Sequence, residues 1–380
     1  MKIALVNSRK PRAFHPDESW LAWTMALAQA LACQGHTLCT SVGTIGYDLA
    51  LFGAAKGQGI LEVFAPPQDA PSVPSRLPRE VGPSNLVTRI VDATEVHRDR
   101  IVIDAADLVI AVAIRAGGHM ETLLRERFQS GKKVCVVEPP EDKPMWRGTK
   151  NLAQFGVPTV AKDLAALAQN IMLSRASRNH EKIDWGTAIR VWHDAPLTSP
   201  TLAHYTRAAP GPWPGQSYRE YLEDLWRGGL RARRDAPAAL SRIVQSSKLL
   251  ASGRLIRGRF PVVSFTAVSP DRIGELHRYR AHLLRWDFEP WGIVFDRDWL
   301  IKQHARPVHY LSNHAFQTLF AEERPWFQKH EPPDCDYSGE EEWRVSGDVD
   351  FSAAPSEAVR LVLGSAASVE TSSSCAAASL

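Results

Sequence analysis

The pattern of apolar and polar positions differs between the two halves of the chain. In the first half it predicts strands that alternate with helices. Residues 3–6 (IALV) form a short apolar run that predicts a buried strand. Residues 20–33 (WLAWTMALAQALAC) have the composition of a helix, which Gly35 would end. This order is typical of α/β sheets, in which parallel strands are connected by helices.

The alternation of strands and helices continues later in the first half. The apolar, β-branched runs 101–103 and 108–114 predict strands, and residues 134–137 predict another. The pair Gly117-Gly118 marks a turn before a helix predicted over residues 121–130. Strand, turn, helix and strand make a βαβ unit, so we expect a Rossmann-like parallel sheet with right-handed crossovers.

The second half has a different predicted order of elements, in which helices precede several short strands without strict alternation. This pattern indicates an α+β domain. Helices are predicted over residues 218–226 and 236–250, and strands over residues 260–266, 291–295 and 307–310. The expected organisation is a Rossmann-like domain at 1–175, a linker at 176–200, an α+β domain at 201–365 and a disordered Ser/Ala-rich tail at 366–380.

Composition narrows the class of protein. The chain has 380 residues, of which 44% are hydrophobic and 23% charged, as expected of a globular protein rather than a fibrous or disordered one. No apolar run reaches the roughly 18–20 residues of a membrane span, and the polar residues 7–10 interrupt any secretory signal. Five irregularly spaced cysteines make a disulfide framework improbable. We therefore expect a cytoplasmic protein.

Cys33, His36 and Cys39 stand at three-residue spacing and raise the question of a metal site. A closed zinc site needs four ligands, and no further Cys or His pair follows nearby. Cysteine is also among the most often buried residue types. The sequence therefore favours packing at a helix end and predicts no metal site.

Charge is unevenly distributed although the net charge is only +3. Residues 227–259 carry nine basic side chains and the single acid Asp235, whereas residues 331–357 carry nine acids and only Arg344. The basic stretch fits the solvated face of an amphipathic helix, contacts to a pyrophosphate, or a track for a nucleic-acid backbone. Because they directly precede a predicted strand, three of its arginines are the best phosphate candidates: Arg254, Arg257 and Arg259.

Two loops of the first half are candidate ligand sites. Ligands of parallel sheets bind at the carboxyl ends of the strands, where helix N-termini offer free N–H groups to phosphate. The loop after the first strand contains Ser8 and Arg9, and the loop after residues 108–114 contains Gly117, Gly118 and Thr122. Adjacent glycines let a backbone approach a phosphate, and Thr122 could cap the helix or bind the ligand. An ordinary tight turn is the alternative.

These loops carry a resemblance to a known family. A first strand ending in Asn-Ser-Arg, the run ADLVIAV, Gly-Gly-x-x-x-Thr and GKKVCVVEP resemble the SLOG superfamily, which joins the Smf DNA-processing proteins and the lysine-decarboxylase-like enzymes. The resemblance covers residues 1–175 and implies a Rossmann-like domain that binds nucleotides or nucleic acid. The hydrolase signature PGGxGTxxE is replaced here, which favours nucleotide sensing. Glu121 beside the glycines is the only support for an N-glycosidase.

The second half contains residues suited to chemistry on NAD. His204 could donate to a ribose hydroxyl and Tyr205 could stack on nicotinamide, while Ser264 and Thr266 lie on one predicted strand. Loss of nicotinamide leaves an oxocarbenium-like ribose, which a carboxylate such as that of Glu342 would stabilise. Spacing alone favours the alternative, in which His-Tyr-Thr is an ordinary strand start and Glu-Glu-Glu a solvated turn.

Five ordered motifs in the second half, LAHYT, VVSFT, FEPWGIVFDRDWL, ARPVHY and EEEWRVSGDVDF, resemble bacterial ADP-ribosyltransferase-like domains of abortive-infection and DNA-targeting toxin systems. The resemblance spans about residues 200–363. It implies that His204 and Tyr205 contact NAD, that Ser264 and Thr266 line the ribose pocket and that Glu342 is catalytic. Glu340 and Glu341 are its uncertain neighbours.

Taken together, the sequence predicts a phage-defence protein in which a nucleotide-binding domain controls NAD cleavage or ADP-ribosyl transfer. NAD would be the substrate, an unidentified nucleotide would bind the first domain, and nucleic acid or an antitoxin are possible partners. The alternative is a non-catalytic nucleotide- or DNA-binding module whose second domain mediates protein contacts.

Overall fold

The computed structural model describes residues 1–8, 18–79, 85–91, 98–176, 191–192, 194, 200–209, 211–280 and 285–364. The chain divides into two compact units. Unit 1 comprises Met1–Lys182 together with Pro210–Arg233, and unit 2 comprises Ile183–Ala209 together with Arg234–Leu380. The boundary therefore differs from the expected organisation, because a piece of the second half belongs to the first unit. Arg9, most of the expected linker and the tail lie outside the described residues.

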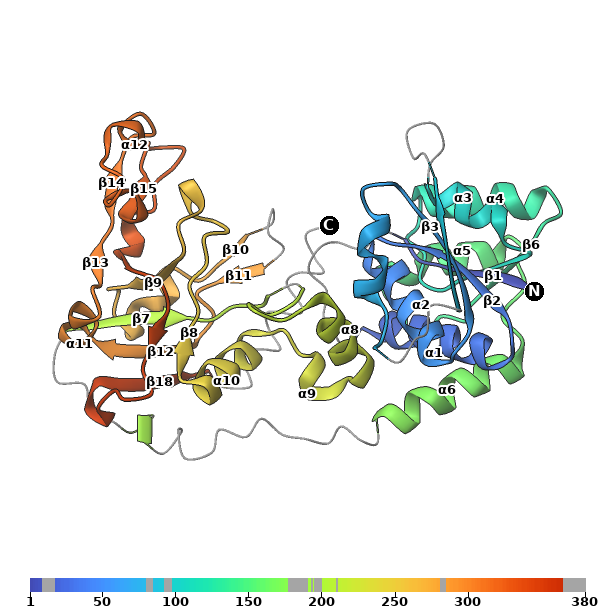
Figure 1. Cartoon of the computed structure of the whole chain (residues 1–380), viewed down its shortest axis with the longest axis horizontal. Helices are drawn as coiled ribbons and strands as arrows, with labels where there is room; N and C mark the ends of the chain where they lie inside the picture. Colours follow the sequence, from blue (N-terminus) through green and yellow to red (C-terminus); the bar gives the residue numbers. More distant parts are fainter. Residues whose placement is uncertain are drawn as a thin grey trace. The chain divides into compact units, whose positions relative to one another are not determined.

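Unit 1 is a doubly wound α/β unit, which confirms the predicted Rossmann-like parallel sheet (Figure 1). All neighbouring strands are parallel, in the order β4-β3-β2-β1-β5-β6. The strands are β1 (Lys2–Val6), β2 (Thr37–Ser41), β3 (Ile60–Ala65), β4 (Leu86–Ile90), β5 (Leu108–Ala111) and β6 (Lys133–Val136). Strand order reverses between β1 and β5, the point at which such sheets bind ligands.

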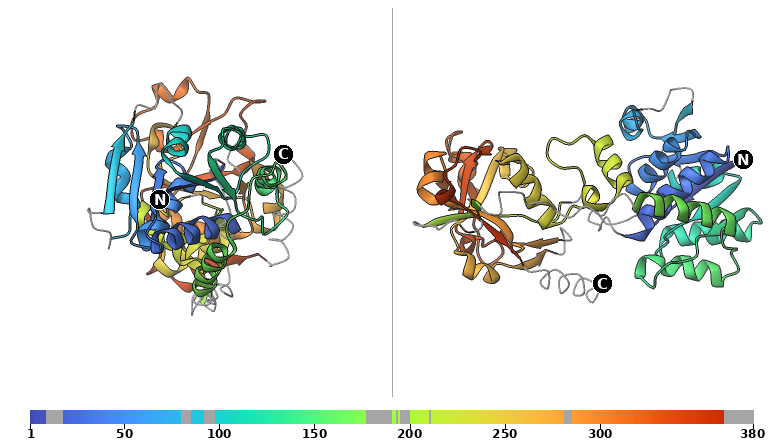
Figure 2. Two further views of the ribbon diagram at one scale, coloured as in Figure 1. Left: turned by 90° about the vertical axis from the view of Figure 1, so that its right-hand side faces the viewer. Right: turned by 90° about the horizontal axis from the view of Figure 1, so that it is seen from below.

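Helices cover both faces of this sheet (Figure 2). The apolar core on one face includes α1 (Ser19–Cys33), α2 (Ile45–Lys56) and α6 (Lys162–Ala176), together with α8 (Tyr218–Arg227) and α9 (Gly229–Ala232). The core on the other face includes α3 (Arg98–Ala105), α4 (His119–Gln129) and α5 (Arg147–Gln154). Because both faces are buried, polar ligand contacts can be placed only at the ends of the strands.

Three sequence expectations need correction. Residues 101–103 form part of α3 rather than a strand, with Val102 and Ile103 facing the core, because tertiary packing overrides β-propensity. Elements over residues 37–65 were not predicted, although they include α2. In unit 2, the predicted helix 236–250 ends at Ser246, since Ser247 adopts a left-handed conformation with φ +50° and a strand follows.

Unit 2 is built on an antiparallel sheet with helices, as predicted for an α+β domain. Its strand order is β13-β16-β9-β7-β12-β18. These strands are β7 (Thr201–Tyr205), β9 (Val262–Thr266), β12 (Trp291–Asp296), β13 (Arg306–Pro307), β16 (Glu342–Ser346) and β18 (Val359–Leu363). The further helices and strands of this unit are α10 (Ala236–Ser246), β8 (Lys248–Leu249), β10 (Arg278–Arg280), β11 (Arg285–Asp287), α11 (Arg297–Lys302), β14 (His309–Leu311), α12 (Ala315–Thr318), β15 (Phe327–Lys329) and β17 (Val349–Asp350).

The two faces of the unit 2 sheet differ in chemistry. Every second side chain of the central strands, including Leu202, Phe265, Ile293 and Val345, belongs to one apolar core. The intervening residues, including Thr266 and Arg344, point to the opposite face and are largely polar on β9 and β16.

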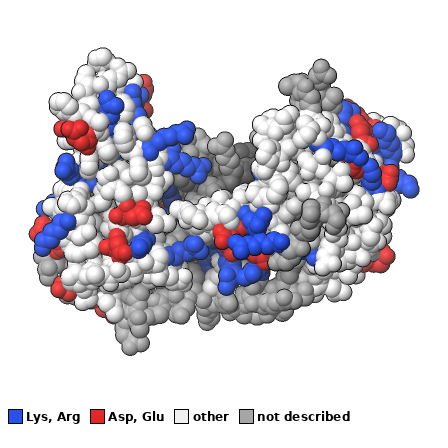
Figure 3. Space-filling model, in the orientation of Figure 1, with Lys and Arg blue, Asp and Glu red and all other residues white. Residues whose placement is uncertain are grey.

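Among the described residues no helix is long and apolar enough to cross a membrane. On the surface drawn in Figure 3, basic and acidic side chains are interspersed.

Candidate functional site

In unit 1, the loops after β1 and β5 are joined at the point where strand order reverses. The amide of Ser8 donates to the carbonyl of Ala113 at 3.0 Å, and the amide of Ala113 donates to Oδ1 of Asn7 at 3.2 Å. The amide of Arg115 donates to Oγ of the buried Ser8 at 2.9 Å. The two loops predicted as ligand sites therefore meet, and Ser8 holds them together.

A third loop, which sequence reasoning missed, lies beside them. It connects β2 to α2 and contains Gly43 and Thr44, and Gly46 follows in the first turn of α2. Gly43 is exposed with φ +87°, and a Cβ atom at Gly46 would lie 3.1 Å from Cβ of Asn7. The oxygen of Thr44 accepts a long, 3.5 Å bond from the amide of Tyr47 at the start of α2. A strand followed by Gly-x-x-Gly and a helix was the signal in the sequence.

Arg98, at the start of α3, brings a guanidinium to this third loop. Its Nη1 donates to the carbonyl of Val42 at 2.7 Å and would lie 3.2 Å from a Cβ atom at Gly43. Its guanidinium carbon lies 5.6 Å from the ring centre of Tyr47. Nε of Arg98 is buried and has no hydrogen-bond partner among the described residues. We call Asn7, Ser8, residues 42–46, Arg98 and residues 113–118 the edge site.

The glycine pair predicted to cradle a phosphate is already occupied by a carboxylate. Gly117, exposed with φ +68°, donates its amide to Oε2 of Glu121 at 2.7 Å. Oε1 of Glu121 accepts from Arg125 at 2.8 Å and Asn151 at 3.3 Å. Burial alone would raise the pKa of Glu121, but these donors lower it below its ordinary value. The carboxylate is thus held as an anion where a phosphate was expected.

The remaining residues of that loop do not complete a phosphate cradle. Gly118 is the N-cap of α4, and no side chain makes a capping hydrogen bond there. Thr122 is exposed one turn further on, so it does not cap the helix. Arg9, the other predicted contact, lies outside the described residues.

In unit 2, four of the predicted NAD-site residues share one face of the sheet. β9 lies between β16 and β7, with Thr266 opposite both Glu342 and Ala203. The same register places Ser264 on the face of Thr266, and Tyr205, two positions beyond Ala203, also points that way. We call Tyr205, Ser264, Thr266, Glu342 and the neighbouring Arg344 the polar face.

His204 points to the opposite, apolar face. It pairs with Ile293 of β12, and its ring centre lies 5.9 Å from that of the core residue Phe265. Nδ1 of His204 lies 2.8 Å from the carbonyl oxygen of Ser264, to which it donates. Burial lowers the pKa of His204 to about 4, a shift that this bond opposes and the Arg207 charge increases. The structure therefore separates His204 from the side chains with which it was expected to act.

The carboxylate of Glu342 is fixed by a buried arginine of its own strand. Nε and Nη2 of Arg344 donate to the two oxygens of Glu342 at 2.8 and 2.9 Å. Arg344 is only 1% exposed, and its Nη1 also donates to the carbonyls of Pro325 and Phe327. The amide of Glu342 donates to the hydroxyl of Tyr310 at 2.8 Å. Glu342 is thus a rigidly oriented anion, partly open to solvent.

Further ionisable groups lie around the polar face. Glu340 pairs with Arg278 at 2.6 Å, and its carbonyl accepts from the hydroxyl of Thr266 at 2.5 Å. Burial raises the pKa of Glu340 in spite of that arginine. The hydroxyl of Tyr205 is buried without a partner among the described residues, and burial with the nearby Asp271 charge raises its pKa to about 12. Perturbed pKa values of this kind accumulate at functional sites and in structural ion-pair networks alike.

The arginines predicted to hold a pyrophosphate lie elsewhere. Arg257 binds Asn313, and its guanidinium carbon lies 4.2 Å from the ring centre of Phe316. Arg254 is exposed, and its charge adds to burial in lowering the pKa of Arg207, which lies near Glu342. Arg259 is exposed as well.

The spaced cysteines of the first half form no metal site among the described residues. Cys33 is exposed, whereas Cys39 is buried with its sulfur 3.7 Å from the carboxylate of Glu62. Burial and the Glu62 charge raise the pKa of Cys39 to about 12, so it remains a thiol.

Comparison with known proteins gives a limited result. No family profile and no curated protein matches the chain. Among solved structures, DNA processing protein A from Helicobacter pylori is 18% identical, with a TM-score of 0.33 over 47% of this chain and 82% of its own. The Moco carrier protein of Chlamydomonas rheinhardtii is 19% identical, with a TM-score of 0.31 over 46% and 97%. At identities and TM-scores this low, activity and ligand have to be argued from this chain's own residues.

Proposed function

We propose that unit 1 binds a nucleotide or a single strand of nucleic acid through its phosphate at the edge site. The observation that carries the proposal is the joining of the β1 and β5 loops at Asn7 and Ser8, where strand order reverses, with the first turn of α2 packed against Asn7 at Gly46. Open α/β sheets bind their ligands at such points.

The first turn of α2 is the best position for the phosphate. The first amides of a helix have no partner within the helix, and they carry a partial positive charge, although Thr44 accepts from that of Tyr47 here. A Cβ atom at Gly43 would lie 3.2 Å from Nη1 of Arg98 and 3.6 Å from Oδ2 of Asp69, so the glycine leaves this space to polar groups. Arg98 adds a guanidinium whose Nε has no partner among the described residues. Exposed Arg115, on the β5 loop, supplies a second cation. The amide of Gly117 contributes nothing, because Glu121 holds it.

The test is binding of two probes, fluorescein-labelled oligothymidine and a fluorescent ATP analogue, measured by anisotropy. Arg98→Gln should weaken binding at least about tenfold, since a charge-assisted phosphate contact contributes about 1.5–3 kcal/mol. Arg100→Gln is the matched control, because Arg100 lies on the same helix and, among the described residues, pairs with the exposed Glu126. It should change the affinity less than about twofold.

The two probes separate the ligand classes. Binding of oligothymidine that weakens steeply with salt indicates a nucleic-acid strand, because several phosphates release counterions. Binding of the ATP analogue alone indicates a nucleotide. No binding of either probe, or equal loss in the two arginine variants, would refute the edge site.

A second function is favoured by a separate observation in unit 2. The register of β7, β9 and β16 places Tyr205, Ser264, Thr266 and Glu342 on one face, with the Glu342 carboxylate oriented by Arg344. We propose that this face binds NAD and cleaves its bond between nicotinamide and ribose.

The proposed reaction uses the Glu342 carboxylate as an anion of fixed orientation. The C1′–N bond breaks, nicotinamide leaves with the bonding electrons, and the Glu342 carboxylate stabilises the oxocarbenium-like ribose. Water or an acceptor hydroxyl then bonds to C1′ and releases a proton. The hydroxyl of Ser264 lies on the same face for the ribose, whereas that of the buried Thr266 is engaged by the Glu340 carbonyl and the Val268 amide. His204 lies on the opposite face, so it has no part in this step.

NAD consumption by the full chain tests this second proposal. Glu342→Gln keeps the size of the side chain and should lower the rate at least about 100-fold, as does removal of a preorganised electrostatic contact. Glu341→Gln is the control, since Glu341 is the exposed neighbour. Equal rates in both variants would exclude Glu342 as the catalytic residue. If the protein consumes no NAD, either alone or with oligothymidine or the ATP analogue bound, the reaction is excluded.

A further inference from the structure

A helix from the second half of the sequence is built into unit 1. The chain leaves unit 2 at Ala209 and returns at Arg234, and the amide of Ala209 donates to the carbonyl of Arg234 at 2.8 Å. Between these points, α8 buries Tyr221, Leu222 and Leu225 in the core that contains α1 and α2. The segment is therefore an integral part of unit 1.

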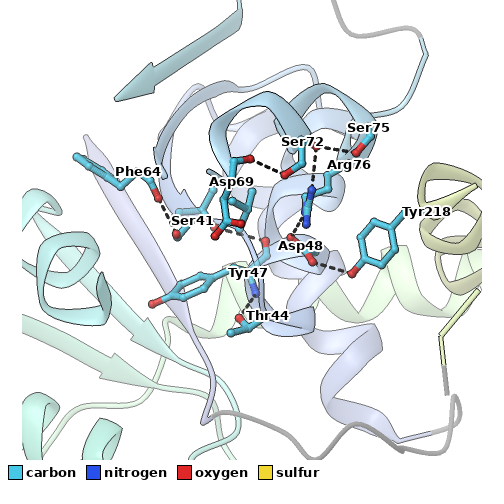
Figure 4. A network of polar contacts seen from close by, with 12 residues as sticks. Ser41, Thr44, Tyr47, Asp48, Phe64, Asp69, Ser72, Ser75, Arg76 and Tyr218 are labelled. Atoms are coloured by element: carbon cyan, nitrogen blue, oxygen red, sulfur yellow. Dashed lines mark hydrogen bonds and ion pairs between the residues drawn. The ribbon is translucent and has the colours of Figure 1, made fainter. Parts of the chain in front are cut away.

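The first residue of α8 contacts a buried carboxylate under the β2–α2 loop (Figure 4). The hydroxyl of Tyr218 donates to Oδ2 of Asp48 at 2.6 Å, and Nε of Arg76 donates to Oδ1 at 2.9 Å. Asp48 is only 2% exposed, so burial raises its pKa, while Arg76, Tyr218 and the backbone of Gly43 oppose that shift. Asp48 belongs to the first turn of α2, and its amide donates to the carbonyl of Thr44 at 3.0 Å. Asp48 thus connects α8 directly to the helix start beside the edge site.

We propose that Tyr218 is a positioning residue for ligand binding at the edge site. It fixes the Asp48 carboxylate in the first turn of α2, where the Asp48 amide bonds the carbonyl of Thr44, and so sets the conformation of the loop before α2. The inference rests on the phosphate-binding function proposed above and adds its control by a segment of the second half. A site formed by N-terminal loops would then depend on residues 210–233 for its affinity.

The physical reason is the cost of a buried carboxylate with too few donors. Without the Tyr218 hydroxyl, Oδ2 of Asp48 loses a charge-assisted hydrogen bond that water cannot easily replace. The loop at Gly43 and Thr44 then samples more conformations, and a ligand has to order it on binding. By linkage, a bound phosphate ligand should also strengthen the docking of α8.

Tyr218→Phe is the test, because it removes the hydroxyl and keeps the ring, which packs on Tyr221 and on the Arg76 guanidinium. The matched control is Glu223→Gln, which breaks the 2.9 Å ion pair between α8 and Lys56 without touching Asp48. Both variants are measured for anisotropy with the labelled oligothymidine and the ATP analogue. Hydrogen exchange of the ligand-free protein is followed in parallel for residues 42–48.

The expected result is an affinity about three- to tenfold lower for Tyr218→Phe, with faster exchange at residues 43–46. Glu223→Gln should change neither by more than about twofold. Unchanged affinity and unchanged loop exchange in Tyr218→Phe would overturn the inference. So would faster exchange confined to α8, because that marks a packing role only.

These outcomes are distinguishable from failure of the proposed function. If the unaltered protein binds neither probe, the phosphate site is refuted, while loop exchange still decides whether Tyr218 positions Gly43. If Tyr218→Phe lowers the stability of all of unit 1, exchange in β6 rises as well. Arg76→Gln, which removes the other side-chain donor to Asp48, then serves as the second variant and should also weaken binding.

Discussion

The two units place their polar groups in opposite ways. In unit 1 the candidate ligand contacts lie in loops at the carboxyl ends of β1, β2 and β5, whereas in unit 2 they lie within the strands β7, β9 and β16. The reason is the kind of sheet. Helices bury both faces of the parallel sheet, so its chemistry is confined to one edge, but an antiparallel sheet can keep one face polar. A unit 2 site is therefore rigid, and a unit 1 site depends on what holds its loops.

The largest expected effect is removal of the arginine that orders the polar face. Arg344→Met leaves the Glu342 carboxylate and the carbonyls of Pro325 and Phe327 without their donor in a buried position. Loss of one partner of such a pair costs about 3–5 kcal/mol. Denaturant titration followed by hydrogen exchange should show this loss in peptides of unit 2 only.

Arg306→Ala is the control for this prediction. Arg306 is the exposed neighbour of Arg344 in the register and contacts the ring of Trp326. Its removal should cost less than about 1 kcal/mol. Equal losses in the two variants would show that the polar face is not organised by Arg344.

The next effect tests whether unit 1 needs a helix from the second half. Leu222 of α8 is fully buried in the core with α1 and α2. Leu222→Ala should destabilise unit 1 by about 2–5 kcal/mol, the range for a large-to-small core substitution. Amide hydrogen exchange should become faster in β1 and β5, although both strands lie more than 100 residues away from Leu222 in sequence. Leu255→Ala, at a site 57% exposed, is the neutral control.

How much the sequence could reveal also differs between the units. Residues 2–6, 108–111 and 133–136 were readable as buried strands, and the βαβ unit led directly to the parallel sheet. Residues 37–41 were not, because TLCTS is too polar for a recognisable strand run, whereas the apolar run ILEVFA of β3 carried a strand signal that was missed. The membership of residues 210–233 in unit 1 is a long-range packing fact that no local pattern encodes.

The candidate sites follow the same division. In unit 2, the spacing of Ser264 and Thr266 by two residues already placed them on one face of a strand. His204 and Tyr205 were treated as a pair, although adjacent strand residues must point to opposite faces. In unit 1, the adjacent glycines 117 and 118 drew the prediction, and nothing in the sequence showed that Glu121 would hold their loop. Arg98 could be found only from the fold.

A smaller effect concerns the face on which His204 lies. Its pKa of about 4 in the folded protein is below the ordinary value of 6.5, so the unfolded chain binds more protons between these pH values. Stability should be complete above about pH 6.5 and fall by about 1–3 kcal/mol as the pH drops toward 4. His204→Gln should flatten this part of the profile, whereas His309→Gln, at an exposed position, should not. If both variants retain the unaltered slope, His204 is not buried as a neutral ring.

The smallest effect decides between the two glycine-containing loops of unit 1. Glu121→Gln removes the charge beside Gly117 but keeps an oxygen to accept its amide. If the phosphate lies on α2 beside Arg98, affinity for the labelled probes should change less than about twofold, because the intervening charge interaction is screened. If the phosphate instead rests on the loop before α4, loss of the competing anion should strengthen binding several-fold. Glu126→Gln, an exposed change of the same charge on the same helix, calibrates the general electrostatic contribution. Tighter binding by Glu121→Gln but not by Glu126→Gln would show that the ligand lies on the β5–α4 loop rather than the β2–α2 loop. Control of ligand binding through Asp48, which lies next to the β2–α2 loop, would then lose its basis.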